Sequence, residues 1–228
     1  MIRYLSGVSS APLREVARQY DIGLLCQPGN GYTSQIGDYP YWAADNGCFS
    51  QGDRFNLGEY LEWLRDLSPR AGSCLFATAP DVVGDARATW ERGREIFPVI
   101  RALGFPAALV AQNGLRLGPQ RELHVHLDDR TDSWTGIEVP WDSFDVLFIG
   151  GDDGYKVGPM NLGRASVRTL VWEAKARGKR VHMGRVNSLV RLRLAQWMEC
   201  DTADGTFLAF GPRVNLPRLT GWLEALRD

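Results

Sequence analysis

The residues of this chain best suited to chemistry are acidic side chains that follow short apolar segments. Asp204 lies in the segment 201–207, at the point where it gives way to Gly205. Strand ends and loops carry chemistry more often than strand middles, which carry packing. A lone aspartate in such a place can equally be a helix cap or an ion-pair partner. Asp45 and Asp81 hold corresponding places after two earlier apolar segments, so three carboxylates share one kind of position.

Amide and glycine-containing turns lie at the ends of three further apolar segments. In chain order they are Gln112, Gly150-Gly151 and Met183-Gly184-Arg185. Glycine allows a backbone N–H to approach a ligand closely. A carboxamide offers both a donor and an acceptor. Together with the three carboxylates, these groups form a set that could bind and transform a polar ring.

Guanine and its 7-deaza analogues are rings of this kind, with donors at N1 and N2 and an acceptor at O6. An ionised aspartate accepts from both donors, and a glutamine amide or a backbone N–H satisfies O6. A second aspartate can attack the anomeric carbon of a nucleoside, because glycosidic cleavage passes through an oxocarbenium-like state that a carboxylate can trap. A third can move the proton.

The elements that must position these residues are eight short apolar segments, mostly alternating with helical patterns. The expected strands are 4–9, 22–27, 41–44, 74–79, 106–111, 146–149, 181–183 and 201–207. Ser10, Asn56 and Ser188 are expected N-caps of three of the helices, and Pro98 is expected to kink another. The pattern predicts one (β/α)8 barrel domain over 1–228, with a doubly wound open sheet as the competitor. Active sites of such barrels lie at the C-terminal ends of the strands, so all these residues should meet at one mouth.

Composition narrows the class of protein. The 228 residues are 44% hydrophobic and 23% charged, with a net charge of −1, so any nucleic acid must be held by a local patch. The four cysteines form no C-x-x-C pair, which argues against a disulfide framework or a structural zinc site. No signal peptide or bilayer-spanning apolar stretch is apparent, so the expectation is a soluble cytoplasmic protein without a membrane partner.

Five motifs in order resemble the tRNA-guanine transglycosylase family, whose members exchange guanine for queuine or archaeosine precursors. Asp45-Asn46-Gly47-Cys48-Phe49-Ser50 resembles D-S-G-G-F/Y-Q, and Val110-Ala111-Gln112-Asn113-Gly114 resembles V-Q-G-G. Gly150-Gly151 with Val157-Gly158 resembles G-G-x-x-V-G, His182-Met183-Gly184 resembles L-M-G, and Cys200-Asp201-Thr202-Ala203-Asp204 resembles G-V-D-x-F-D. The match extends from about Asp45 to Phe207, most of the chain.

The resemblance implies a role for each matching residue. Asp204 is the expected nucleophile and Asp45 the proton-handling carboxylate. Asp81 would read N1 and N2. The implied partners of O6 are Gln112 and the Gly150-Gly151 backbone. The base would be sandwiched between Phe49 and Met183, and Gly184 would also line the base-binding site. Arg185 and Lys156 are the expected phosphate contacts; for Arg191 and Arg193 a solvated helix face is the favoured interpretation.

Departures from the family shape the functional hypothesis. The zinc site that follows the family's nucleophile has no counterpart here, and alternate histidines in His124-Val125-His126 fit a solvated face better than a metal pair, so no metal or cofactor is expected. Residues 152–156 are inserted where the family is shorter. A barrel without the family's zinc site and tRNA-docking elements looks more like the reduced relatives that some phages use to place 7-deazaguanines in DNA. The leading hypothesis is therefore exchange of DNA guanine for a free preQ0-like base.

Three rival hypotheses remain. A glycosylase would use water in place of the incoming base and leave an abasic site. A tRNA substrate would keep the chemistry and change the nucleic acid. A catalytically silent nucleic-acid-binding barrel would need neither Asp45 nor Asp204, although both are present.

Overall fold

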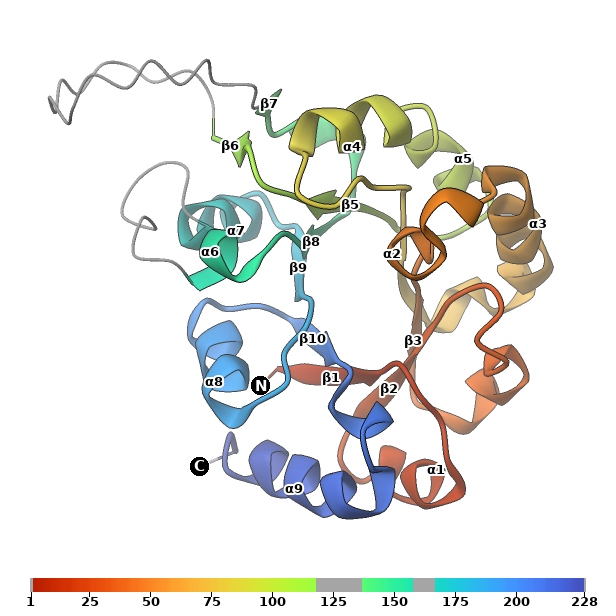
Figure 1. The fold of residues 1–228 in the computed structure, drawn as a ribbon, viewed down its shortest axis with the longest axis vertical. Coiled ribbons are helices and arrows are strands. Elements are labelled where there is room, and N and C mark those ends of the chain that lie inside the picture. Colours follow the sequence, from red (N-terminus) through yellow and green to blue (C-terminus); the bar gives the residue numbers. More distant parts are fainter. Residues whose placement is uncertain (1, 118–136, 158–166, 228) are drawn as a thin grey trace, which may run out of the picture.

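The computed structural model describes residues 2–117, 137–157 and 167–227, and in it eight short strands close into a parallel barrel (Figure 1). The strands are β1 (Arg3–Ser6), β2 (Ile22–Cys26), β3 (Trp42–Ala44), β4 (Cys74–Thr78), β5 (Ala107–Ala111), β8 (Val146–Ile149), β9 (Arg180–Met183) and β10 (Thr202–Gly205). Around the barrel they lie in the order β1-β10-β9-β8-β5-β4-β3-β2. The predicted (β/α)8 fold is confirmed, and the open sheet is excluded because β1 pairs with both β2 and β10.

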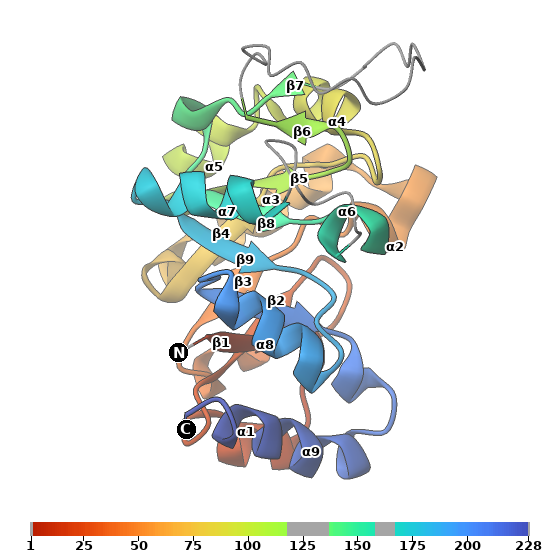
Figure 2. The ribbon, with the colours of Figure 1, turned by 90° about the vertical axis from the view of Figure 1, so that its left-hand side faces the viewer.

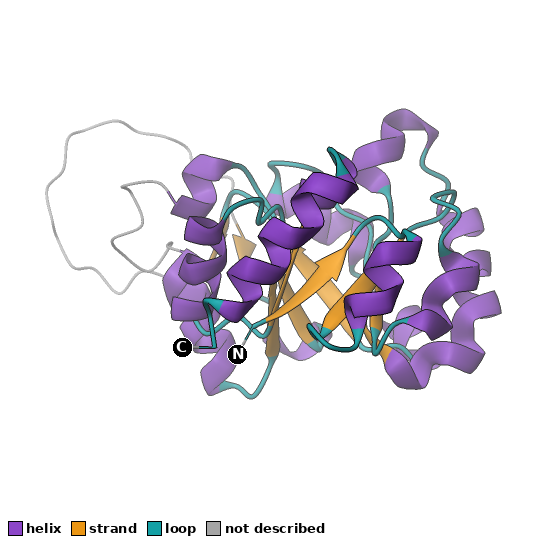
Figure 3. Ribbon diagram, turned by 90° about the horizontal axis from the view of Figure 1, so that it is seen from below, coloured by secondary structure: helices purple, strands orange, loops and turns teal. Residues whose placement is uncertain are grey.

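Helices surround the barrel and enclose its strands (Figure 3). The longer ones are α1 (Ala11–Ala17), α3 (Leu57–Leu67), α4 (Ala86–Gly93), α5 (Phe97–Ala102), α7 (Val167–Ala176), α8 (Leu189–Trp197) and α9 (Pro212–Glu224). Short turns of helix are α2 (Cys48–Gln51), η1 (Thr33–Asp38), η2 (Gly52–Arg54), η3 (Ser68–Ser73), η4 (Trp141–Ser143), α6 (Asp153–Val157) and η5 (Phe207–Ala209). Two further strands, β6 (Leu115–Arg116) and β7 (Ile137–Glu138), pair outside the barrel.

The barrel has two apolar cores because side chains alternate between the two faces of each strand. Trp42 and Ala44 of β3 belong to the outer core between strands and helices, whereas Ala43 belongs to the inner core of the barrel. Phe76 of β4 also points inward and packs edge-on against Phe148 of β8, with ring centroids 5.9 Å apart. This alternation decides which strand-end residues face the barrel interior.

The predicted N-cap residues and the predicted proline break are found in the helices. The side chains of Ser10, Asn56 and Ser188 each accept a hydrogen bond from a backbone N–H in the first turn of α1, α3 and α8. Pro98 divides the predicted helix in two: α4 ends at Gly93, and α5 begins at Phe97 with the proline in its first turn, where a missing N–H is harmless.

Two strands are shorter than their apolar patterns indicate. The expected strand 4–9 ends at Ser6, because the Ser6 hydroxyl bonds to the backbone of Val8 and turns the chain. The expected strand 201–207 ends at Gly205, because Phe207 begins the short helix η5. His124, His126 and Gly158 lie outside the described residues, as does the predicted start of the helix that contains α7.

The strands all end on the same side of the barrel, which is called the mouth below. α2 follows β3 and α6 follows β8, and both stand on this side (Figure 2). No helix within the described ranges is long and apolar enough to cross a membrane.

Candidate active site at the mouth of the barrel

A cavity of about 380 Å³ opens at the mouth, within the size range typical of ligand sites. Ten of the eleven predicted site residues line it: Asp45, Phe49, Asp81, Gln112, Gly150, Gly151, Lys156, Gly184, Arg185 and Asp204. Apolar side chains such as Leu25, Val110 and Phe148 form much of its remaining wall. Strand alternation therefore gathers residues that are up to 159 positions apart in sequence, from Asp45 to Asp204, around one space.

Asp204 is oriented by a buried histidine. The Asp204 Oδ1 atom lies 2.9 Å from His182 Nε2, and His182 Nδ1 lies 2.8 Å from the Thr202 hydroxyl. When Nε2–H donates to the carboxylate, Nδ1 accepts from Thr202, so both ring nitrogens are satisfied. Gly184 makes room for this pair, because a Cβ atom there would lie 2.8 Å from Phe148 and 3.3 Å from Asp204 Oδ1. Within the described part of the chain, Asp204 Oδ2 has no hydrogen-bond partner and remains available to a ligand.

Asp45 enters the cavity after β3, where its backbone N–H donates to Cys26 O at 2.7 Å. Burial raises the pKa of the Asp45 carboxyl to about 7, and the nearby Asp81 and Asp204 carboxylates act in the same direction. The Thr78 hydroxyl lies 3.4 Å from Asp45 Oδ1. A carboxyl that titrates near neutral pH can both give and take a proton at the pH where an enzyme works.

Asp81 is held by two amides whose orientation the backbone fixes. Asn46 Oδ1 accepts from Cys48 N, so its Nδ2 faces Asp81 Oδ1 at 3.1 Å. Gln112 Oε1 accepts from the N–H groups of Gly84 and Gly151, so its Nε2 donates to Asp81 Oδ2 at 2.7 Å. Burial raises the pKa of Asp81, while these two donors oppose the shift. Each carboxylate oxygen keeps a lone pair for a further donor.

The two glycines after β8 do not present free donors. Gly150 N–H donates to Ala111 O at 3.0 Å, and Gly151 N–H donates to Gln112 Oε1 at 3.0 Å. The expectation that this backbone satisfies O6 of a purine is therefore corrected: both glycines line the cavity, but their amides are already used. The second hydrogen of Gln112 Nε2 and the Lys156 ammonium are donors among the described residues that line the same cavity.

The predicted phosphate contact of Lys156 is also wrong, because its side chain is not placed to reach a phosphate outside the cavity. It is 4% exposed, and its Nζ donates to Gly184 O at 2.9 Å. The inserted segment 152–156 folds into α6, which carries this side chain inward over the end of β9. Burial lowers the pKa of Lys156 to about 8, and the Asp204 carboxylate opposes the shift.

Phe49 and Arg185 meet across the mouth. They follow β3 and β9, which are four places apart in the eight-stranded order and so lie opposite each other. The Arg185 guanidinium lies 4.8 Å from the centroid of the Phe49 ring, which is 69% exposed. Arg185 has a φ of 61°, a conformation uncommon for a residue other than glycine and often found at functional sites.

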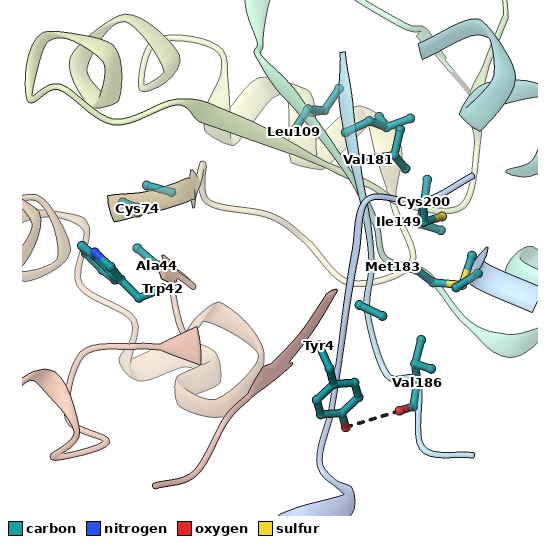
Figure 4. Packing of buried hydrophobic residues seen from close by; sticks show 14 of the residues in the cluster. Tyr4, Trp42, Ala44, Cys74, Leu109, Ile149, Val181, Met183, Val186 and Cys200 are labelled. Atoms are coloured by element: carbon teal, nitrogen blue, oxygen red, sulfur yellow. Dashed lines mark hydrogen bonds between the residues drawn. The ribbon is translucent and has the colours of Figure 1, made fainter. Parts of the chain in front are cut away.

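Met183 is not brought to the cavity. It is one residue beyond His182, which points into the barrel, so alternation directs Met183 outward. It is 3% exposed in the outer core, where Figure 4 shows it beside Ile149 and Cys200. The predicted stacking of a base on this methionine is corrected for that reason: its side chain packs against the helices.

Sequence reasoning missed His182 and Asn46. The signal for His182 was its position, since β9 pairs Met183 with Ala203 and His182 with Thr202, two residues before Asp204. An inward Asp204 on β10 therefore implies an inward His182 on the neighbouring strand. Asn46 gave no such signal, because it follows Asp45 directly and its contact with Asp81 depends on the turn after β3.

A larger cavity, of about 580 Å³, opens at the opposite end of the barrel. Its aspartate, Asp201, is bonded to Lys175 at 2.6 Å and to the backbone N–H of Val181 at 2.7 Å, as in a structural ion pair. Active sites of such barrels lie at the C-terminal ends of the strands, so the smaller cavity, at the mouth, is the candidate site. The described residues contain no group of three or more metal-binding side chains.

No family model matches this chain, and no curated protein matches it. Among solved structures, phosphoribosyl anthranilate isomerase from Thermus thermophilus is similar, with a TM-score of 0.55, 14% identity, and coverage of 99% of this chain and 100% of that one. Tryptophan synthase from M. tuberculosis has a TM-score of 0.48, 13% identity, and coverage of 98% and 92%. The first similarity shows the barrel fold alone.

The pKa of Asp45 predicts how stability depends on pH. A raised pKa in the folded state means that folding loses stability as pH rises from about 4, where the unfolded aspartate ionises, through about 7. Asp45→Asn removes this penalty. Its free energy of unfolding, relative to wild type, should rise between pH 5 and pH 8 by on the order of a few kcal/mol, at about 1.4 kcal/mol per pKa unit.

Urea unfolding at the two pH values measures this difference, with Asp66→Asn on the exposed face of α3 as the control for losing one charge. A relative stability that is the same at both pH values would contradict the shifted pKa.

Proposed function

We propose that this protein exchanges guanine in DNA for a free 7-deazaguanine through a covalent aspartyl–deoxyribosyl intermediate. The observation that carries the proposal is the grouping of Asp204, Asp45 and Asp81 around one cavity, each with different partners. Carboxylates in distinct environments can divide the roles of nucleophile, proton carrier and base reader.

Asp204 is the nucleophile in this proposal. His182 fixes one carboxylate oxygen, and the other is left to approach C1′ of the target nucleotide. The C1′–N9 bond breaks as the C1′–Oδ2 bond forms, and the bonding electron pair leaves with the base. In the second step N9 of the incoming base attacks C1′. The C1′–N9 bond forms as the C1′–Oδ2 bond breaks, and the electron pair of the broken bond returns to the Asp204 carboxylate. Two inversions retain the β-configuration.

Asp45 carries the proton. In its neutral form it protonates the departing guanine, and as a carboxylate it then takes the corresponding proton from the incoming base. A pKa of about 7 suits both steps, since the two forms are similarly populated near neutral pH. Transfer to water in place of a base would make the enzyme a glycosylase, and the residues would be the same.

Asp81 and Gln112 read the base. Both Asp81 oxygens already accept one amide hydrogen, which favours the ionised form that guanine N1–H and N2–H need as a partner. Phe49 offers an exposed ring at the lip for stacking. To enter such a cavity the target nucleotide must leave the helical stack.

The test is incubation of the protein with isotopically labelled guanine or labelled preQ0 and with either DNA or tRNA, followed by digestion to nucleosides. Label in deoxynucleosides supports the proposal. Label in tRNA alone would show that tRNA is the substrate. Abasic sites without label would indicate a glycosylase. If neither label nor abasic sites were found, the protein would be a non-catalytic barrel.

Asp81→Ala should lower the rate of guanine exchange about tenfold or more, because loss of a buried polar partner costs roughly 1–3 kcal/mol. The exchange assay measures the rate, and a thermal melt verifies that the variant is folded. Asp66→Ala is the control for a surface carboxylate. Full exchange activity in folded Asp81→Ala would remove Asp81 from base recognition.

Arg185→Ala should weaken DNA binding and reduce its salt dependence by about 0.9 log unit of affinity per log unit of salt, as expected for one lost phosphate contact. Arg185 is exposed at the cavity rim. Arg193→Ala, exposed on α8 and not part of the cavity lining, is the matched control. Equal salt slopes for wild type and Arg185→Ala would show that Arg185 does not contact a phosphate.

A further inference from the structure

Lys156 is a buried cation inside the candidate site, and the described residues use only part of its hydrogen-bonding capacity. Its Nζ makes one hydrogen bond within the described residues, to Gly184 O at 2.9 Å. An ammonium group has three hydrogens, so two have no acceptor among the described residues and can meet a ligand. Lysine is rarely buried without a carboxylate partner, and the side chain here is 4% exposed. Burying an unpaired N–H group is energetically costly, and a hydrogen-bond acceptor on a ligand in the cavity would remove this cost.

The order of groups around the cavity limits which part of a base can meet Lys156. From β10 to β3 the lining residues are Asp204, then Gly184 with Lys156, then Gln112, Asp81 and Asp45. Under the proposed function, N9 of the purine points to Asp204 and the N1–N2 edge points to Asp81, on the far side. The remaining two edges then face the Lys156 side and the Asp45 side.

Donor and acceptor matching decides between these two edges. The edge with O6 and position 7 carries the O6 acceptor and no donor, whereas the edge with N2 and N3 carries the N2 donor beside the N3 acceptor. Lys156 can only donate, so it suits the edge without a donor, whereas Asp45, which gives and takes a proton in the proposed reaction, can face the edge with N2 and N3 in either form. The O6 edge therefore belongs on the Lys156 side, which also supplies the donor that Gly150 and Gly151 cannot give.

This geometry points to a role for Lys156 in selecting the incoming base, an inference that rests on the proposed function. We infer that Lys156 faces the 7-substituent and selects 7-deazaguanines whose substituent is an uncharged or anionic hydrogen-bond acceptor, such as a nitrile, carboxamide or carboxylate. It disfavours a protonated aminomethyl group, which offers no acceptor and places a second positive charge beside the ammonium in a poorly solvated space.

The surroundings of Lys156 keep it charged near neutral pH. Burial lowers its pKa to about 8, and Arg185 and Arg191 act in the same direction. Asp204 and Asp153 oppose them. At pH 7 the protonated form therefore predominates, and the repulsion of a cationic substituent operates.

The test is a competition in the exchange assay among 7-cyano-, 7-carboxamido- and 7-aminomethyl-7-deazaguanine at pH 7, with labelled guanine as the reference acceptor. Wild type should prefer the cyano or carboxamido base to the aminomethyl base by about tenfold or more in kcat/KM. Lys156→Met should bring this ratio to within about twofold of unity. Arg193→Met, which removes an exposed cation outside the cavity, should leave the ratio as in wild type.

Two outcomes would overturn the inference while the proposed function stands: wild type inserts the aminomethyl base as well as the cyano base, or the preference survives in Lys156→Met. Incorporation of labelled guanine identifies these cases. Failure to insert any base overturns the proposed function and this inference with it. Should Lys156→Met fail to fold, Lys156→Gln serves in its place, and the wild-type preference alone can still refute the inference.

Discussion

The two-residue alternation of side chains along the strands is the constraint on which both the core and the candidate site depend. In a closed parallel barrel every second residue points inward, so a residue at a strand end reaches the mouth only if its place in the alternation is correct. Ala43 and Asp45, and likewise Thr202 and Asp204, are two residues apart on the same face. Moving either aspartate by one position would place it between barrel and helices.

Charge is the second determinant of the site, because the barrel brings three carboxylates into a cavity with apolar walls. Burial and mutual repulsion raise the pKa of Asp45 to about 7, while amide donors hold Asp81 and a histidine holds Asp204. Lys156 supplies the one buried positive charge among the described lining residues. The cavity therefore offers a ligand both hydrogen-bond acceptors and a buried cation between apolar walls.

The sequence was sufficient to predict the fold, because each strand is a short apolar run and the helix caps are local signals. It was also sufficient to predict which strand ends carry polar groups. It did not predict how those groups pair. The engagement of Gly151 N–H by Gln112 and the inward turn of Lys156 depend on contacts between loops from different strands. The predicted place of Met183 in the site is wrong for a different reason: it rests on the family motif, whereas strand alternation, applied from Asp204 to His182, directs the methionine outward.

The proposed exchange depends on a covalent bond between Asp204 and the sugar, which denaturing electrophoresis of protein and DNA mixed with a slowly reacting acceptor base can detect. We expect an adduct with wild type, no adduct with Asp204→Asn, and an adduct that can still be trapped with Asp45→Asn. An adduct that survives Asp204→Asn and disappears with Asp45→Asn would contradict the assigned roles.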